Sequence, residues 1–234
     1  IEYGYLAPSK LAVSPDYISY ITFDYNPNQQ ITAVIKLYHI QTGELETIAY
    51  LNEDLSNHAF GYPNISGNKM TWCKAEVKPD GTYKGQSYLY DIESKAMTTL
   101  ATDENIINPT ISGDYICAEG KPGITYYDGE ICIYNIKDNR WEYKINGQYE
   151  QYNKMPVEIY LNYLTATDKY LLWETALQRT LIIFRFKDQK LYKIVSYEEG
   201  QHVRPKLVQD NVLIYGVRPI DSTADNTWYY VYLK

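Results

Sequence analysis

Four carboxylates are the first residues whose positions could serve a reaction. Glu119 and Glu174 stand at equivalent positions of a repeated pattern, and Asp24 and Glu76 lie near that position in two further copies. A pair of carboxylates about 5 to 10 Å apart can hydrolyse a glycosidic bond, one as the acid and the other as base or nucleophile. Repeated acidic residues in outward turns are usually solvated surface. For this reason a small carbohydrate-active enzyme, a glycosidase with central carboxylates, is the alternative interpretation and not the first one; the first is a non-catalytic binding domain.

Nucleophilic and metal chemistry have less support in the sequence. There is no G-x-S-x-G elbow, and the three histidines are not spaced for a catalytic triad. His39 lies at a strand position that is polar in several repeats, which favours a structural role. His58 and His202 are expected in loops between repeats, where histidines are more often surface residues than metal ligands. We therefore predict no catalytic residue, no metal and no cofactor.

Tyrosines in the longest connection form the candidate binding site. Asn146 to Asn162 combines Tyr with Gln and Asn, which offer flat apolar faces with hydrogen-bonding tips suited to sugars or peptides. The connection could equally bridge two repeats and pack its tyrosines on them, and this alternative stays open. The candidate ligand-binding residues are Tyr149, Tyr152, Tyr160, His58, His202 and Arg204.

The cysteines do not organise the fold. Cys73, Cys117 and Cys132 cannot all pair with one another, and no two have the CxxC spacing of a zinc or redox site. Cys117 and Cys132 are expected on neighbouring strands, so one bond between them is conceivable. Buried free thiols are the preferred interpretation.

Charge and hydropathy exclude two classes of partner. A formal net charge of −7 and a pI near 5.0 argue against wrapping a phosphate backbone, so nucleic acid is not expected. No apolar run approaches the roughly 18 to 20 residues of a membrane span, and no signal peptide opens the chain. Because the sequence begins at Ile1 without Met, we expect a trimmed mature domain.

An internal repeat must position all of these residues. Pro63 to Trp72 (PNISGNKMTW) matches Pro109 to Ala118 (PTISGDYICA). The same frame fits three further segments: Ser14 to Tyr20, Thr167 to Trp173, and Gln209 to Tyr215. A second pattern follows each first one, as in Leu89-Tyr90-Asp91-Ile92 and Ile133-Tyr134-Asn135-Ile136. Trp72 and Trp173 end a strand at the same position of the repeat, so we predict that both are buried between blades.

Each repeat contains four strand-like runs, which is the composition of a propeller blade. The high content of Tyr, 27 residues, agrees with an all-β protein. We predict a single β-propeller domain over residues 1–234, of five blades with four antiparallel strands each. The expected units are 7–50, 51–101, 102–145, 146–196, and 197–234 plus 1–6. The fifth unit ends after its third strand, and Ile1 to Leu6 should supply the fourth and close the ring.

Two segments carry a family resemblance. Val13 to Tyr20 (VSPDYISY) resembles the pattern W-S-P-D-G-x-x-I-A-F, and Leu37 to Leu45 (LYHIQTGEL) resembles its partner, a strand followed by D-x-x-T-G-E. Together they resemble the TolB-like (WD-type) propeller repeats. The match is good in the first three units and limited to turn and aromatic positions in the last two, and five blades depart from the six of TolB. Such blades occur in periplasmic scaffolds, surface proteins and non-catalytic lids of oligopeptidases.

The expected blades have two unequal faces. Connections between the first and second strands, and between the third and fourth, are short, whereas the other connections are long. Binding groups concentrate in loops on a rigid scaffold. We therefore expect a non-catalytic propeller that binds a protein, peptide or glycan through its long-loop face, in an extracytoplasmic location such as the periplasm, cell surface or medium. A third interpretation is a lid or fragment of a larger hydrolase.

Overall fold

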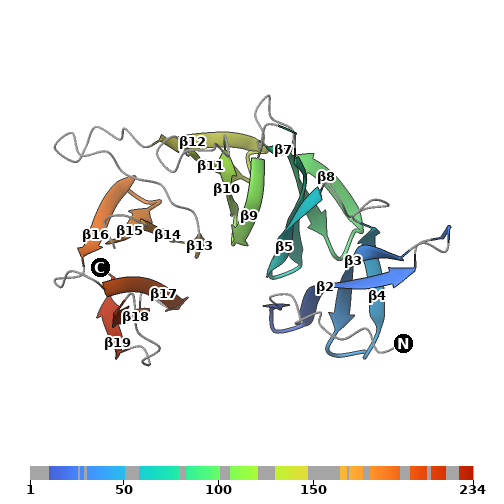
Figure 1. Ribbon diagram of the computed structural model, residues 1–234, viewed down its shortest axis with the longest axis horizontal. Helices are drawn as coiled ribbons and strands as arrows, with labels where there is room; N and C mark the ends of the chain where they lie inside the picture. Colours follow the sequence, from blue (N-terminus) through green and yellow to red (C-terminus); the bar gives the residue numbers. More distant parts are fainter. Residues whose placement is uncertain are drawn as a thin grey trace. The chain divides into compact units, whose positions relative to one another are not determined.

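Within the described residues, the strands form five antiparallel sheets, each built from strands that follow one another in the sequence (Figure 1). The computed structural model describes residues 11–25, 27–28, 31–50, 58–77, 79, 83–100, 106–120, 130–146, 164–167, 169–175, 180–195, 201–209, 212–219 and 227–233. The chain divides into two compact units, Ile1–Gly113 and Asp114–Lys234. No helix among the described residues is long and apolar enough to cross a membrane.

The first unit holds two complete four-stranded sheets, ordered β1-β2-β3-β4 and β5-β6-β7-β8, and a further strand, β9. Its strands are β1 (Ala12–Val13), β2 (Tyr17–Tyr25), β3 (Ile31–His39), β4 (Leu45–Tyr50), β5 (His58–Ser66), β6 (Lys69–Val77), β7 (Tyr83–Asp91), β8 (Ala96–Leu100) and β9 (Ile106–Ser112).

The second unit holds β10 to β19. The sheet orders are β12-β11-β10-β9, β13-β14-β15-β16 and β17-β18-β19. The strands are β10 (Tyr115–Gly120), β11 (Glu130–Asn135), β12 (Arg140–Asn146), β13 (Thr165–Ala166), β14 (Tyr170–Thr175), β15 (Thr180–Arg185), β16 (Lys190–Val195), β17 (Gln201–Gln209), β18 (Val212–Pro219) and β19 (Thr227–Tyr232).

This arrangement confirms an all-β chain made of four-stranded antiparallel sheets. The sheet of β17 to β19 has three strands in the described part of the chain. Ile1 to Leu6, expected to complete it, lie outside the described residues. The five-blade count, the closure, the single domain and the exact unit boundaries therefore stay predictions.

The core of the first unit lies between its two complete sheets. Ile35 and Leu37 of β3 pack with Met70 and Trp72 of β6, and all four side chains are at most 1% exposed. Trp72 also stacks on Tyr88, with ring centroids 5.4 Å apart and an interplanar angle of 18°. The alternation of β7 turns Tyr88 and Tyr90 toward this core, because every second side chain of a strand points to the same face. The predicted burial of Trp72 between two sheets is confirmed.

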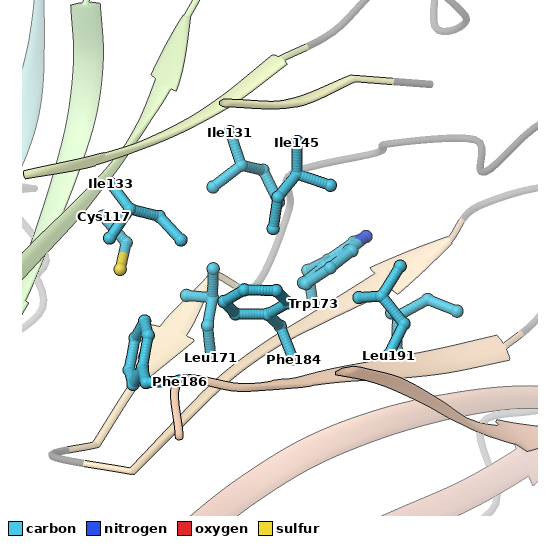
Figure 2. Packing of buried hydrophobic residues seen from close by; sticks show 10 residues of the cluster. Cys117, Ile131, Ile133, Ile145, Leu171, Trp173, Phe184, Phe186 and Leu191 are labelled. Atoms are coloured by element: carbon cyan, nitrogen blue, oxygen red, sulfur yellow. The ribbon is translucent and has the colours of Figure 1, made fainter. Parts of the chain in front are cut away.

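The second unit buries its middle sheet on both faces. On one face, Trp173 and Phe184 pack with Ile131 and Ile133 of β11, and Figure 2 shows these side chains pointing toward one another from two sheets. On the other face, Leu172, Leu181 and Ile183 pack with Leu213 of β18. Trp173 is fully buried, so its predicted place between sheets is confirmed as well.

All three cysteines are buried thiols that form no disulfide bond. Cys117 lies opposite Ile133, whereas Cys132 lies opposite Ala118. Because neighbouring residues of a strand point to opposite faces, the two thiols lie on different faces of the sheet and cannot form the bond considered from the sequence. Cys132 instead fills the space beside Gly120, where an added Cβ would lie 2.6 Å from the sulfur.

Replacing Trp72 by Ala should lower the free energy of unfolding by about 3 to 5 kcal/mol, because the change leaves a cavity between two sheets. Trp173→Ala should have an effect of the same size. The control is Met97→Ala on β8, whose side chain is 58% exposed and whose loss should change stability by less than about 1 kcal/mol. Urea unfolding followed by tryptophan fluorescence and circular dichroism measures these differences. Equal stability of the Trp72 and Met97 variants would contradict the packing role.

Candidate binding site

One side of each complete sheet is closed by its own turns. The residue that follows the third strand donates its N–H to a carbonyl in the turn between the first two strands, at 2.8 to 3.0 Å. The four bonds are Ile40 to Asp16, Ile92 to Asn68, Ile136 to Asp114, and Phe186 to Lys169. The last residue of the turn between the third and fourth strands has a positive φ in three of these sheets, at Lys95, Asn139 and Gln189, and Gly43 has one in the first sheet. In each sheet, such a bond satisfies one backbone N–H and one carbonyl of the two turns.

Polar residues that end the third strands act as caps of these turns. Asp91 Oδ1 accepts the N–H of Ser94 at 3.0 Å and its hydroxyl at 2.9 Å, and these bonds hold the pKa of Asp91 below its ordinary value. Asn135 Oδ1 accepts the N–H of Asp138 at 3.2 Å. The sequence analysis identified a strand position that is polar in several repeats, and it missed the bonds from this position to the turn.

Arg185 also caps the turn that follows its strand, and it does so through a bidentate ion pair with Asp188. Its Nε donates to Asp188 Oδ1 at 2.9 Å and its Nη2 donates to Oδ2 at 2.5 Å. The pair lowers the pKa of Asp188 to about 2 and raises the pKa of Arg185. The guanidinium also lies 4.9 Å from the ring centre of Tyr192. Besides the attraction between the charges, a bidentate pair of this kind fixes the orientation of the guanidinium relative to the carboxylate.

His39 belongs to a charged group that joins the first two sheets. Its Nε2 lies 3.3 Å from Glu46 Oε1, close enough for an ion pair when the ring is protonated but not aligned as a hydrogen bond. Lys95, in a turn of the second sheet, donates to the same oxygen at 3.1 Å, which raises the pKa of Lys95. The structural role expected for His39 agrees with these contacts.

The candidate ligand-binding residues are only partly within the described chain. Tyr149, Tyr152 and Tyr160 lie outside it. His58 is the first residue of β5, opposite Glu76, and His202 lies on β17, opposite Arg218. Their expected position in loops is therefore wrong, because both strands extend further than the repeat frame indicated. Arg204 lies on β17 opposite Gly216.

The four carboxylates of the glycosidase alternative lie on second strands. Asp24 is exposed on β2 and accepts a hydrogen bond from Lys36 Nζ at 2.6 Å, which lowers its pKa. A general acid of a glycosidase requires the opposite shift. Glu119 lies opposite Ile131, and Glu174 opposite Leu181. Over the described ranges, no group of three or more His, Cys, Asp or Glu residues is placed to hold a metal ion.

Irregular first strands are a feature that the sequence analysis missed. The pairing of β5 with β6 shifts between Gly61 and Asn64, and the pairing of β17 with β18 shifts between Pro205 and Leu207, directly after Arg204. Proline within a sheet is confined to edges and bulges. The signal was present in the repeat, since Pro63 and Pro109 hold the same position.

Repeated four-stranded antiparallel sheets formed in sequence order place the chain in the β-propeller class. No protein-family model matches the sequence, and no curated protein matches it. Among solved structures, acylaminoacyl peptidase from Pyrococcus horikoshii is similar with a TM-score of 0.57 and 10% identity over 96% of this chain. This chain spans 38% of the peptidase chain, and a likeness at such identity concerns the fold alone.

Two further structures have a TM-score of 0.49. The β-propeller domain of the Trilobed protease from Pyrococcus furiosus is 8% identical, over 96% of this chain and 80% of that chain. A chain of the nidogen/laminin complex is 13% identical, over 84% of this chain and 66% of that chain.

The pair of Arg185 and Asp188 predicts a pH dependence of stability. A carboxylate whose pKa is lowered by folding stabilises the fold above its unfolded pKa, and this contribution is lost as the pH falls through the folded pKa. Asp188→Asn should therefore lower Tm at pH 6, and the difference from the parent should shrink as the pH falls below 4 and approach zero below pH 2. Thermal melts across this range measure it.

In an Arg185→Gln background, Asp188→Asn should produce a much smaller pH-dependent difference, because the main cause of the lowered pKa is gone and only Lys190 remains. A Tm difference that stays constant from pH 6 to pH 2 would show that the pair does not act through its charge.

Proposed function

We propose that this chain is a non-catalytic β-propeller domain that binds a protein, peptide or glycan through the side of its sheets opposite the hydrogen-bonded turns. The observation that carries the proposal is the difference between those two sides. Turns such as Gly67–Asn68 and Gly113–Asp114 are short and bonded to a neighbouring turn, whereas the connection 147–164 is long. Long connections on a regular scaffold are commonly functional.

The finer assignments belong to the same proposal. The chain is a five-bladed member of the TolB-like group, located outside the bacterial cytoplasm, and Tyr149, Tyr152 and Tyr160 contribute to binding. The contacts of Asp24 support a binding domain over a glycosidase, since its lowered pKa suits a permanent ion pair with Lys36.

Changing Tyr149 and Tyr152 together to Ser should weaken binding at least tenfold, since aromatic anchors tend to dominate interface energy. Stability should change by less than about 1 kcal/mol, as expected for exposed side chains. A glycan array and a pulldown with bacterial envelope proteins provide the binding readout. The matched control is Ile40→Ser on the turn side, where the side chain is 40% exposed. Intact binding by the double variant would move the site away from this connection.

Deleting Ile1 to Leu6 should lower Tm by several degrees, because we propose that this segment completes the sheet of β17 to β19. The support is the exposure of β19, where Trp228, Tyr230 and Tyr232 are 51%, 69% and 68% exposed. An uncovered strand of this kind favours aggregation. Differential scanning calorimetry and size-exclusion chromatography measure the effect, with deletion of Lys234 as the control. Unchanged melting and elution would exclude the closure.

A further inference from the structure

The side of β8 that faces away from β7, called here the β8 edge, is an uncovered strand edge. β8 (Ala96–Leu100) ends the sheet order β5-β6-β7-β8, and within the described residues β7 is the one strand that pairs with it. Its first four residues are exposed, with Met97 58% exposed. The whole strand pairs with β7, and the side chain of Leu100 is buried. β8 is thus held firmly on one side, while its other side offers N–H and C=O groups to a further strand.

The residues of β8 differ from those of the other fourth strands. Charged side chains, lysine above all, keep an exposed strand edge from pairing with another chain. Such charges are present on β4 (Glu46), on β12 (Arg140, Glu142 and Lys144) and on β16 (Lys190 and Lys193). β8 reads Ala-Met-Thr-Thr-Leu, without a charge and without proline. Of these four strands, β8 is the one that lacks this protection.

The charged residues beside β8 are engaged within the chain. Lys95 directly precedes the strand, and its Nζ donates to Glu46 Oε1 of the first sheet at 3.1 Å. Asp91 lies opposite Ala96 on β7, accepts hydrogen bonds from Ser94 and lies 3.3 Å from Lys69 Nζ. Neither charge is therefore committed to guarding the β8 edge.

A second copy of the same strand fits an edge of this composition. Two strands related by a two-fold axis run antiparallel, and the axis brings both copies of every charge close together, so a charged strand repels its own copy. Centred on Thr98, the pairing sets the two Thr98 residues opposite each other, Met97 opposite Thr99, and Ala96 opposite Leu100. Thr–Thr pairs across strands are favourable, and no like charges meet. The two four-stranded sheets would then form one continuous sheet.

We propose that the β8 edge is an interface between two copies of this chain, which associate by antiparallel pairing of β8 with β8. The proposal does not depend on the ligand or on the side of the sheets that binds it. Five residues on each strand form a small interface. The dimer is therefore weak, with a dissociation constant in the micromolar range or above.

Sedimentation velocity of the parent from about 5 to 500 µM should show a reversible equilibrium of monomer and dimer. Thr98→Lys and Thr98→Glu should each weaken dimerisation at least tenfold, because like charges then meet at the two-fold axis. Their Tm at the lowest concentration should stay within about 2 °C of the parent, since the side chain of Thr98 is exposed. An equimolar mixture of the two variants should regain the dimer, because Lys then faces Glu across the strands.

A cysteine substitution tests the register of the pairing. Cα atoms of directly opposite residues in an antiparallel pair lie about 4.5 to 5.5 Å apart, within the range that a disulfide bond spans. Thr98→Cys should therefore form a covalent dimer under mild oxidation, and the three native thiols should not compete because they are buried. Thr47→Cys is the matched control, since it also replaces an exposed threonine of a fourth strand. It should remain monomeric in non-reducing electrophoresis.

Three results would overturn the β8 interface. The first is a parent protein that stays monomeric up to about 500 µM. The second is a dimer that Thr98→Lys leaves as strong as in the parent, as expected if the exposed aromatic side chains of β19 mediated the association. The third is cross-linking of Thr98→Cys that is no greater than that of Thr47→Cys. None of these results bears on ligand binding by the monomer.

Discussion

Burial of a sheet on both faces is the constraint on which the rest of the structure depends. Every residue from Tyr170 to Trp173, and every residue from Leu181 to Phe184, is buried. Alternate side chains of these runs enter two different cores. Burying each large apolar side chain contributes about 1.5 to 3 kcal/mol, whereas a hydrogen bond in a turn contributes about 1 kcal/mol. Packing between sheets therefore determines where the strands lie, and the turns follow.

The turns connect strands whose positions packing has already determined. A connection of four or five residues between two packed strands requires a left-handed residue near its end, and Gly43 adopts this conformation at little cost. Lys95 and Gln189 adopt it with a side chain present, because bonds from Asp91 and Arg185 fix the rest of each turn. The bonds within these turns occupy backbone groups on this side, which supports the proposal that recognition occurs on the opposite side.

The features predicted from the sequence are those that repeat. Four-stranded sheets and the burial of Trp72 and Trp173 follow from positions that recur with the same residue type. The strand positions of His58 and His202 were not predicted, because the pairing of β5 and β17 extends each strand beyond the repeated sequence pattern. The capping role of Asn135 and the pairing of Asp24 with Lys36 depend on which side chain reaches which atom across a turn or ladder. Repeat spacing carries no information on such distances.

Asn108 differs from the left-handed residues of the turns in what its strained conformation accomplishes. A left-handed residue in a turn reverses the chain, so its cost is offset by the pairing of two strands. Asn108 sits in the middle of β9, where an extended residue would continue the ladder with less strain. Its conformation instead turns an N–H toward Sγ of Cys73, which belongs to the neighbouring sheet. Chain reversal does not explain this geometry, whereas the bond that it allows to the neighbouring sheet does.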